Sequence, residues 1–395
     1  MRIGMVLCKP YPPDIRLEKE IRSLTEAEHN LFVLAERRKD ELKIEKVLGA
    51  ITERYTPPDS FRRRLDWLRF QTSFRSGFWS NRIRDFVKRN NIEILHVHDL
   101  PLVATTIAIA QEFDIPVVAD MHENYPAAKQ LWSQNIRNPL VWFGDDYRRW
   151  QRYEKRILPL ANKVITVVDE AAQRLQESKT VNSENMTVVM NVEERTWFDA
   201  HTTTSIAEDE TIRIVYVGGV RPHRGLDEVI KALAHLKDHN LLLRVVGARG
   251  EYAKELKDLA KNIGIASKVD LIPWRPLQEV PNTIIESDIG IIPHQKHAHT
   301  DATIPHKLFQ YMLGRKPVIV SNCKPLERIV KETRAGLVFE SGNVRDLAAK
   351  IAELYADAEI RKTLGSNGRI AASGKYSWEA EGQKLVKLYE QFRTF

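Results

Sequence analysis

Short runs of β-branched residues alternate with helical patterns along the 395 residues of this chain. Such alternation is typical of βα units, whose strands form parallel sheets covered by helices. In the first half we expect strands over residues 3–7, 30–34, 94–97, 116–119 and 163–168. In the second half we expect them over residues 212–217, 241–246, 269–272, 289–292 and 317–320. The sequence therefore predicts an α/β fold with two Rossmann-like sheets, one in each half.

The length of the chain exceeds that of one ordinary hydrophobic core and indicates two domains. Residues 192–211 are polar, threonine-rich and without periodicity, so we expect a linker there. We therefore expect Rossmann-like domains over 1–191 and 212–375. A final segment, 376–395, has a helical pattern and is expected to pack back on the N-terminal domain. Ligands of such domains bind outside the carboxyl ends of the strands, so two facing domains would leave a binding cleft there.

The composition excludes several classes of protein. With 43% hydrophobic and 29% charged residues, a disordered chain is excluded. The formal charge of +7 favours an anionic partner, which could be a phosphate ester, a nucleic acid or an acidic membrane face. Two distant cysteines, Cys8 and Cys323, indicate no disulfide framework and favour the cytoplasm. No apolar run approaches the roughly 20 residues of a membrane span, so we expect any membrane contact to be peripheral.

A glycine-rich turn follows the predicted strand 212–217. Residues 218–225 read GGVRPHRG, and a helical pattern follows them. Glycines allow close approach of the backbone to a ligand, and a helix N-terminus offers free N–H groups to an anion. Arg221 and Arg224 add two positive charges that suit phosphate oxygens. The turn is typical of a phosphate site, and the alternative is a tight βα turn with solvated arginines.

A second basic helix start is predicted in the stretch IPHKLFQYM, residues 304–312. Pro305 suits the first helical position, because its missing N–H would be unpaired there. His306, Lys307 and Leu308 would then lie in the first turn, where a lysine opposes the helix dipole unless an anion is bound. Alternatively, Lys307 points to water, which would cost about a few tenths of a kcal/mol. The two basic helix starts together predict a clamp for a diphosphate.

Two segments combine arginines with aromatic residues. Residues 61–84 contain seven arginines, six aromatic residues and a single acidic residue, Asp66. Trp67, Phe70, Phe74 and Phe78 recur at spacings of three and four, which predicts one aromatic face on a helix. Residues 142–156 repeat this character. Basic amphipathic helices bind anionic membrane surfaces, and the alternative is that the aromatic stripe packs in the core while the arginines are solvated.

Five stretches follow one another in the C-terminal half: IVYVGGVRPHRGLDEVIKAL, RVVGARGEYAKELKDLA, VDLIPWRPLQEVPNTIIESDIGIIP, IPHKLFQYMLGRKPVIVS and AGLVFESGNVRDLAAKIAEL. In this order and spacing they resemble the donor domain of the GT-B glycosyltransferases of family 4. The N-terminal half is similar to one branch of this family through YPPDIRLEKEIRSL and HVHDLPLV with VVADMHENYP. It implies a GT-B fold and a retaining, hexosyltransferase-type activity (EC 2.4) on a UDP- or GDP-sugar, without cofactor or metal. The absence of a D-x-D motif agrees with a metal-independent reaction.

The resemblance also implies roles for individual residues. Catalysis would involve His122, Arg224 and Lys307, with His122 contacting the donor sugar as a neutral imidazole. Alternatively, His122 caps the next helix. The donor nucleotide would contact Gly218, Gly219, Arg221, Arg224, Trp274, Pro305, His306, Lys307, Leu308 and Gln310. The N-terminal domain would bind the acceptor through Asp14, Arg16, His98, Asp99 and Glu123.

This chain departs from the family pattern at two places. The family's pair of glutamates, eight positions apart, maps onto Ala302 and Gln310. Gln310 can still hydrogen-bond ribose hydroxyls, and the neighbouring Asp301 could substitute for the other carboxylate. In the phosphate loop, Gly219 stands where an arginine is usual, and Arg221 could supply that charge.

We therefore expect a glycosyltransferase for a glycan or lipid-linked acceptor, in cell-surface polysaccharide or glycolipid biosynthesis at the cytoplasmic face of the membrane. Alternatives of the same fold are a catalytically silent binding partner and a sugar-nucleotide 2-epimerase. A nucleic-acid binder is disfavoured, because the basic residues are not confined to one face of a known nucleic-acid module.

Overall fold

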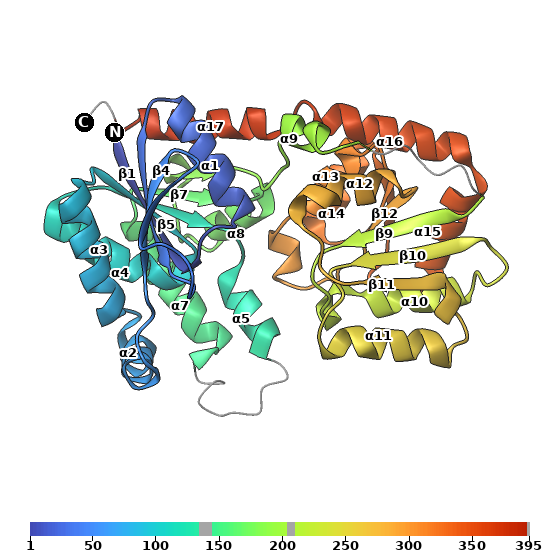
Figure 1. Ribbon diagram of the computed structural model, residues 1–395, viewed down its shortest axis with the longest axis horizontal. Helices are drawn as coiled ribbons and strands as arrows, with labels where there is room; N and C mark the ends of the chain where they lie inside the picture. Colours follow the sequence, from blue (N-terminus) through green and yellow to red (C-terminus); the bar gives the residue numbers. More distant parts are fainter. Residues whose placement is uncertain (134–143, 204–209, 393–395) are drawn as a thin grey trace. The chain divides into compact units, whose positions relative to one another are not determined.

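The computed structural model describes residues 1–133, 144–203 and 210–392 of the chain. It forms two compact units, one made of residues 1–190 with the segment from 381 onward, the other of residues 191–380. In each unit, helices cover both faces of a sheet whose strands are parallel, apart from β3 in the first unit (Figure 1). Among the described residues, no helix is long and apolar enough to cross a membrane.

The first unit has an eight-stranded sheet in the order β3-β4-β2-β1-β5-β6-β7-β8, in which only β3 runs antiparallel to its neighbour. Its strands are β1 (Arg2–Pro10), β2 (Asn30–Glu36), β3 (Ile44–Val47), β4 (Ala50–Tyr55), β5 (Ile94–His98), β6 (Val117–Met121), β7 (Lys163–Thr166) and β8 (Met186–Val188). Its helices are α1 (Ile15–Glu26), α2 (Ser60–Ser73), α3 (Gly77–Asn90), α4 (Val103–Phe113), α5 (Tyr125–Ser133), α7 (Tyr147–Ile157), α8 (Asp169–Glu177) and α17 (Trp378–Glu390), the last from Glu381 onward.

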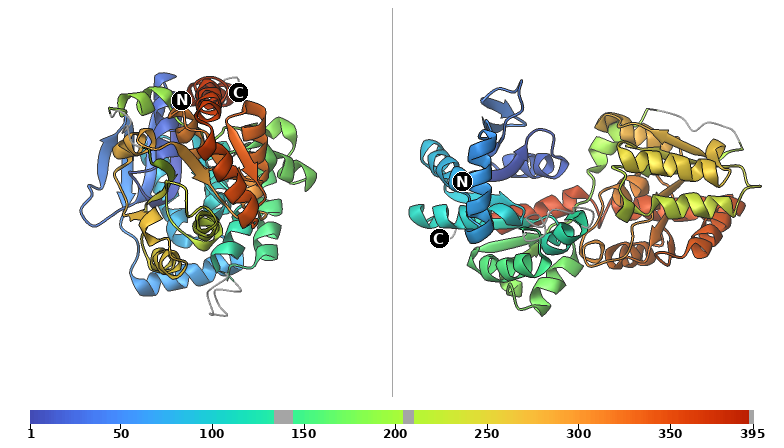
Figure 2. Two further views of the ribbon diagram at one scale, coloured as in Figure 1. Left: turned by 90° about the vertical axis from the view of Figure 1, so that its right-hand side faces the viewer. Right: turned by 90° about the horizontal axis from the view of Figure 1, so that it is seen from below.

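The second unit has a six-stranded, all-parallel sheet in the order β11-β10-β9-β12-β13-β14. Its strands are β9 (Ile212–Val217), β10 (Leu241–Val246), β11 (Val269–Ile272), β12 (Ile289–Ile292), β13 (Val318–Ser321) and β14 (Gly336–Phe339). Its helices are α9 (Arg195–Ala200), α10 (Leu226–Ala234), α11 (Glu251–Asn262), α12 (Val280–Ile285), α13 (Lys307–Leu313), α14 (Lys324–Thr333), α15 (Val344–Ala356) and α16 (Ala358–Ala372). Helices α10 and α11 lie side by side on one face of this sheet (Figure 2, right panel).

Each strand predicted from the sequence is present, and the largest difference is at β1, which continues to Pro10. The predictions missed β3, β4, β8 and β14. β3 carries mostly exposed charged residues, and β8 has three residues, so neither shows a buried β-branched run. β3, β8 and β14 are short edge strands that are only partly buried, so their sequence pattern is weak. β4 lies between β3 and β2, and its pattern is hidden because polar residues, among them Glu53 and Arg54, are buried in it.

The order of strands reverses direction once in each sheet. In the first unit β1 pairs with β2 on one side and β5 on the other, and in the second unit β9 pairs with β10 and β12. Such a switch point leaves a crevice outside the carboxyl ends of the two strands, where ligands of α/β sheets bind. The loops after β1 and β5, and those after β9 and β12, are therefore the places to look for a site.

Part of the segment predicted as a linker has regular structure. It contains α9, whose Phe198 is buried, and it begins with Val192 and Glu193, which are both buried. The low periodicity of the sequence hid this short helix, because six residues are too few to show a repeat.

The first basic aromatic segment forms two helices instead of one. Phe74 ends α2 in the left-handed conformation, with φ of 54°, and its ring stacks on Tyr153 with centroids 3.9 Å apart. Phe70 and Phe78 also pack against the core of the first unit. The prediction of one aromatic face on one helix was therefore wrong, and these rings contribute to the core.

The second basic aromatic segment also packs its rings inward. Trp150 and Tyr153 of α7 are 2% and 1% exposed, while Arg148, Arg152 and Arg156 of the same helix are exposed. Trp142 and Phe143 lie outside the described residues. In the described part of this segment the aromatic rings therefore pack in the core and the arginines are solvated, which is the alternative to a membrane-binding helix. We no longer expect α7 to contact a membrane.

A different set of apolar side chains is exposed on α2. None of the residues of this helix is buried, and Phe61, Leu65 and Leu68 are 69%, 51% and 47% exposed. They are spaced by four and three residues, which places them on one stripe. In Figure 1, α2 lies at the lower end of the first unit. We call Phe61, Leu65 and Leu68 the α2 stripe.

Candidate functional site

The glycine-rich turn follows β9 at the switch point of the second sheet. Gly218 and Gly225 have φ of 131° and 67°, which favours glycine. A Cβ on Gly218 would lie 2.9 Å from Lys307 Nζ, and one on Gly225 would lie 1.9 Å from the carbonyl oxygen of Pro293. The turn therefore brings the backbone of Gly218 directly against Lys307, as expected for two parts of one site.

Two cations meet at this turn. Lys307 Nζ lies 3.5 Å from the centroid of the Tyr216 ring, and Arg224 Nη1 lies 3.1 Å from Nε2 of His294, which follows β12. Burial and the nearby Arg224 guanidinium hold the pKa of Lys307 well below its usual value. Burial and both cations likewise hold the pKa of His294 well below its usual value, so His294 is neutral. Within the described parts of the chain, neither Arg224 nor Lys307 pairs with a carboxylate.

Helix α13 begins at Lys307, with His306 in the N-cap position. Pro305 therefore precedes the cap, and the prediction that it occupies the first helical position was wrong by two residues. Lys307 is still in the first turn, but its ammonium group rests on Tyr216 and does not point to water. Leu308 is fully buried and belongs to the core, so it offers a ligand at most its backbone.

The remaining residues predicted for the donor differ in exposure. Arg221 and Trp274 are exposed, and Trp274 stacks with the Arg249 guanidinium at 5.6 Å. Around Gly219 there is open space where a side chain would stand. The loops after β9 and β11 thus leave room for a ligand beside the basic group.

Ala302 and Gln310, which stand at the positions of the family's two glutamates, are both buried. Ala302 is buried, and the carboxylate of Asp301 accepts a hydrogen bond from the Lys324 backbone N–H at 2.9 Å, at the start of α14. Asp301 is therefore committed to a helix end. Gln310 is 4% exposed, and its Nε2 donates to Glu193 at 2.9 Å.

The first unit contains a buried charge network at its own switch point. Arg16, at the start of α1, donates from Nε and Nη2 to the two oxygens of Asp120 at the end of β6, both at 2.9 Å. Its Nη1 donates to the carbonyl of Val189 at 3.0 Å, and Nε lies 2.9 Å from Glu20. The resemblance had implied that Arg16 contacts the acceptor. However, Arg16 is only 5% exposed, so it lies behind the surface and does not face an acceptor.

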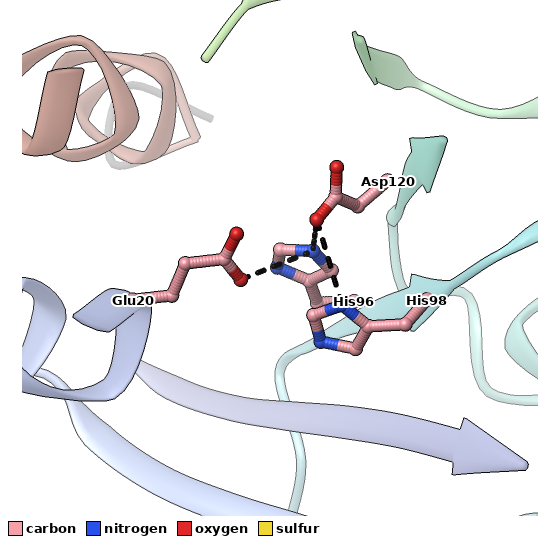
Figure 3. A group of neighbouring side chains, drawn as sticks. All are labelled: Glu20, His96, His98 and Asp120. Carbon is pink, nitrogen blue, oxygen red and sulfur yellow. Dashed lines mark ion pairs between the residues drawn. The ribbon is translucent and has the colours of Figure 1, made fainter. Parts of the chain in front are cut away.

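Four buried side chains of this network have the composition of a metal site. Ligand atoms of Glu20, His96, His98 and Asp120 lie within 4.8 Å of one another, and Figure 3 shows His96 between the two carboxyl groups. However, the Arg16 guanidinium already pairs with both carboxyl groups. Burial also raises the pKa of Glu20 to about 8, and a protonated carboxyl is not a metal ligand. We therefore assign these residues to holding Asp120, with Arg16 as the cation.

His98 is fully buried, so it does not reach an acceptor. Its Nδ1 lies 3.5 Å from Asp120 and 3.2 Å from Nε2 of His122, and burial lowers its pKa to about 3. The neutral ring of His98 thus packs beneath His122. The two residues at this strand end therefore have different roles. His98 supports the His122 ring from below, and Asp99 is described with His122.

His122 is the partly exposed member of the network. Its Nε2 lies 2.9 Å from Asp120, and its Nδ1 lies 3.7 Å from Asp99. Burial alone would lower its pKa, but Asp99 and Asp120 raise it to about 9. His122 is therefore an imidazolium near neutral pH, and not the neutral ring implied by the resemblance.

The next helix, α5, is capped by a residue other than His122. The side chain of Asn124 accepts from the Ala127 N–H at 3.4 Å, and its carbonyl accepts from Ala128. The alternative that His122 is a helix cap is therefore wrong. Glu123, between His122 and this cap, is partly exposed.

Asp99 occupies a strained backbone position. Its φ and ψ are 64° and 154°, a region essentially restricted to glycine, at a cost of about 1–3 kcal/mol. Its N–H donates to the carbonyl of Asp120 at 2.9 Å, which holds the strained residue in place. Such strain is concentrated at functional sites. It places the Asp99 carboxylate next to the free Nδ1–H of His122.

Asp14 has a structural role. It caps α1 by accepting from the Leu17 N–H at 3.0 Å, and it pairs with Lys9 at 2.6 Å. Burial opposes ionisation, but Lys9 lowers the pKa of Asp14 to about 2. His122 and Asp99 are partly exposed at this switch point, whereas Asp14, Arg16 and His98 are held in structural contacts. The sequence reasoning ranked Asp99 below His122, because backbone strain is invisible in sequence.

Comparison with known proteins gives matches in both halves. The family model for glycosyl transferases group 1 matches residues 200–371, and the model for glycosyltransferase family 4 matches residues 17–192. An uncharacterized glycosyltransferase of Methanocaldococcus jannaschii is 30% identical over 177 residues, which are 45% of this chain and 47% of that protein. This match therefore spans about half the length of that relative.

Solved structures resemble the chain over its whole length. Sucrose-phosphate synthase of Thermosynechococcus elongatus has a TM-score of 0.79 at 16% identity and covers 100% of this chain and 99% of its own. HepE of Anabaena, in complex with UDP-glucose, has a TM-score of 0.73 at 16% identity, with 99% and 100% covered. At this identity the likeness shows the fold.

The network of His122 predicts a pH dependence. A raised pKa stabilises the folded state fully below the unfolded value near 6.5, and this contribution is lost as the pH rises through about 9. We expect the unfolding free energies of wild type and His122→Gln to differ by on the order of 3 kcal/mol more at pH 6 than at pH 10. Denaturant unfolding across this range tests it.

A side-chain titration by NMR gives the matched measurement. The imidazole of His122 should lose its proton near pH 9 in the wild type and at lower pH in Asp99→Asn, which removes one of the two charges facing it. A midpoint near 6.5 in the wild type would contradict the proposed network.

Proposed function

The chain belongs to the glycosyltransferases of group 1 and family 4 and has the GT-B fold, and from this premise we propose a specific reaction. It transfers a sugar from a nucleotide diphosphate donor to a glycan or lipid-linked acceptor, with retention of configuration and without a metal. The observation that carries the proposal is the meeting of Arg224 and Lys307 at the switch point of the second sheet, with no carboxylate paired to either among the described residues.

The energetics of this basic group favour a diphosphate. Burial and the nearby Arg224 guanidinium depress the pKa of Lys307, and a bound dianion would raise this pKa again by giving both side chains an opposite charge. The Tyr216 ring holds the ammonium group in place without neutralising it. Since a nucleotide sugar loses its diphosphate with negative charge, the same cations would stabilise the transition state.

We infer the donor class from the same group. HepE, which shares the fold, was solved with UDP-glucose, so UDP- and GDP-sugars are the donors to test first. In the reaction, the bond between the anomeric carbon and the phosphate oxygen breaks, and a bond to the acceptor oxygen forms on the same face. The proton of the acceptor hydroxyl passes to the departing diphosphate.

In the first unit, His122 and Asp99 suit a sugar hydroxyl. Nδ1 of His122 and the Asp99 carboxylate are 3.7 Å apart, too far for a mutual hydrogen bond. A hydroxyl oxygen bound beside both groups could accept from the imidazolium and donate to the carboxylate. This supports His122 as the sugar contact and adds Asp99 to it.

Replacing either cation tests the reaction. We expect Arg224→Ala and Lys307→Ala to lower turnover at least about 100-fold, because each removes a preorganised charge at the leaving group. Lys254→Ala is the matched control, since this lysine is 73% exposed on α11 and pairs with Glu251. Steady-state rates on a panel of nucleotide sugars provide the measurement, and normal turnover in both alanine variants would reject the diphosphate site.

A catalytically silent binding partner is the second candidate. It is favoured by the buried Ala302 and by the commitment of Asp301 to α14, which leave no carboxylate at the place of the family's first glutamate. The same panel separates the two functions. Binding of a nucleoside diphosphate with neither transfer nor hydrolysis of any donor would identify a silent partner.

Metal independence has its own test. With Arg16 held between Glu20 and Asp120, we expect chelation of divalent ions to leave turnover unchanged. The assay is the transfer rate before and after dialysis against EDTA, with a metal-dependent transferase treated in parallel. Loss of activity that added Mn²⁺ or Mg²⁺ restores would contradict this prediction.

The acceptor side is proposed from the α2 stripe. Phe61, Leu65 and Leu68 are exposed apolar side chains with arginines 62, 64 and 69 between and beside them. Apolar residues framed by cations suit an anionic lipid surface, where the side chains enter the interface and the arginines meet the headgroups. We propose that α2 binds the anionic membrane face that carries a lipid-linked acceptor.

Vesicle binding tests this surface. Replacing Phe61, Leu65 and Leu68 together by serine should weaken binding to phosphatidylglycerol-containing vesicles at least about tenfold, because three apolar side chains lose their burial. The fold should be unaffected, since none of them is buried. Ile370→Ser, at a 73% exposed position of the second unit, is the control. Equal sedimentation of wild type and triple variant with these vesicles would remove the α2 stripe from the proposal.

A further inference from the structure

Glu193 is a buried carboxylate in the segment that the sequence had indicated as a linker. It is 2% exposed, and its backbone carbonyl accepts from the Trp378 N–H at 3.1 Å. Its Oε1 accepts from the Glu194 N–H at 2.9 Å. A buried carboxyl group is costly unless it is hydrogen-bonded, so these contacts are needed to keep Glu193 at this position.

The other oxygen of Glu193 faces the start of α13. Oε2 accepts from Gln310 Nε2 at 2.9 Å and lies 3.1 Å from His306 Nε2. These two residues flank Lys307 in sequence, one just before it and one a turn later. Glu193 therefore ties together the two neighbours of the lysine that we place at the diphosphate.

The bonds of Glu193 decide how Gln310 presents its amide. An amide has a donating nitrogen and an accepting oxygen, and the network assigns which is which. Because Nε2 is committed to the carboxylate, Oε1 is the atom left to accept a hydrogen bond. Without Glu193 the amide could turn over, and a hydroxyl donor would then meet an N–H group.

This arrangement offsets a departure of the sequence. A glutamate is usual in the family at position 310, and this chain has glutamine there. A carboxyl group is present nonetheless, at Glu193, which accepts a hydrogen bond from Gln310. Glu193 and Gln310 together provide one carboxyl group and one accepting amide oxygen. The carboxyl group lies in the segment before α9, whereas the family has it on α13.

We propose that Glu193 is a positioning residue of the nucleotide site, which fixes Gln310 so that its Oε1 accepts a hydrogen bond from a ribose hydroxyl of the donor. The inference rests on the proposed nucleotide-sugar function and deepens it. Glu193 does not touch the nucleotide itself, because the described contacts occupy both of its oxygens.

Exchanging the two residues provides the test. We expect Glu193→Gln to weaken binding of UDP or GDP about tenfold, since a hydrogen bond to a charged group no longer fixes the amide. Gln310→Glu should weaken it further, because two carboxylates would then face each other in a buried place. The double exchange, Glu193→Gln with Gln310→Glu, restores one donor and one carboxylate and should bind within about threefold of wild type.

Calorimetric titration with UDP and GDP measures the affinities, and thermal unfolding without nucleotide is followed in parallel. In steady-state assays KM for the donor should rise in Glu193→Gln with kcat nearly unchanged, as for lost uniform binding. Glu194→Gln is the matched control on the neighbouring carboxylate. A lower melting temperature with unchanged affinity would show a purely structural role and overturn the inference.

The outcomes also separate this inference from the function on which it rests. If the wild type binds no nucleoside diphosphate, the proposed function fails, and the inference fails with it. If the wild type binds and Glu193→Gln binds equally well, the nucleotide site stands and the inference alone is rejected. A double exchange no better than the sum of the single losses would reject it as well.

Discussion

The pairing of parallel strands on both sides of β1 and of β9 is the constraint on which both sites depend. Because the strand order reverses there, the loops after β1 and β5 separate, as do those after β9 and β12. Gly218 and Gly225 permit the turn after β9 to close against Lys307 and Pro293, and a Cβ at Gly225 would clash with the Pro293 carbonyl oxygen. The position of Arg224 beside His294 follows from this turn, since the two residues come from the two strands of the switch point.

The two switch points handle charge in opposite ways. In the first unit Arg16 pairs with Asp120 and also lies against Glu20, whose raised pKa favours the protonated carboxyl. In the second unit Arg224 and Lys307 lie close together, with a neutral histidine and an aromatic ring as neighbours. A buried charge without an opposite partner costs free energy, and like charges crowded together cost free energy as well. Crowded cations therefore indicate an anionic ligand, whereas the paired network indicates a support for His122.

Much of this was predictable from sequence, and the failures have physical causes. Most inner strands were predicted because burial on both faces demands β-branched runs, although β4, between β3 and β2, was missed. Gly218, Arg224 and Lys307 could be named as candidates because they lie in local motifs. Glu193 was missed, since its partner Gln310 is 117 positions away and its polar surroundings show no period. The strain at Asp99 and the protonated state of His122 arise only when β5 and β6 bring their ends together.

The arginine-aromatic segments show why composition alone does not reveal a membrane surface. Both have the same character in sequence, yet Phe74 and Trp150 pack edge to face within one core, with centroids 5.0 Å apart. The left-handed residue at Phe74 ends α2 and turns the following rings inward. The exposed apolar side chains are those of the α2 stripe, and they are not the rings whose spacing predicted an aromatic face. The proposed lipid-binding surface therefore consists of apolar side chains that do not pack in the core. It is identified from the burial of each side chain, because the spacing of the aromatic residues does not reveal it.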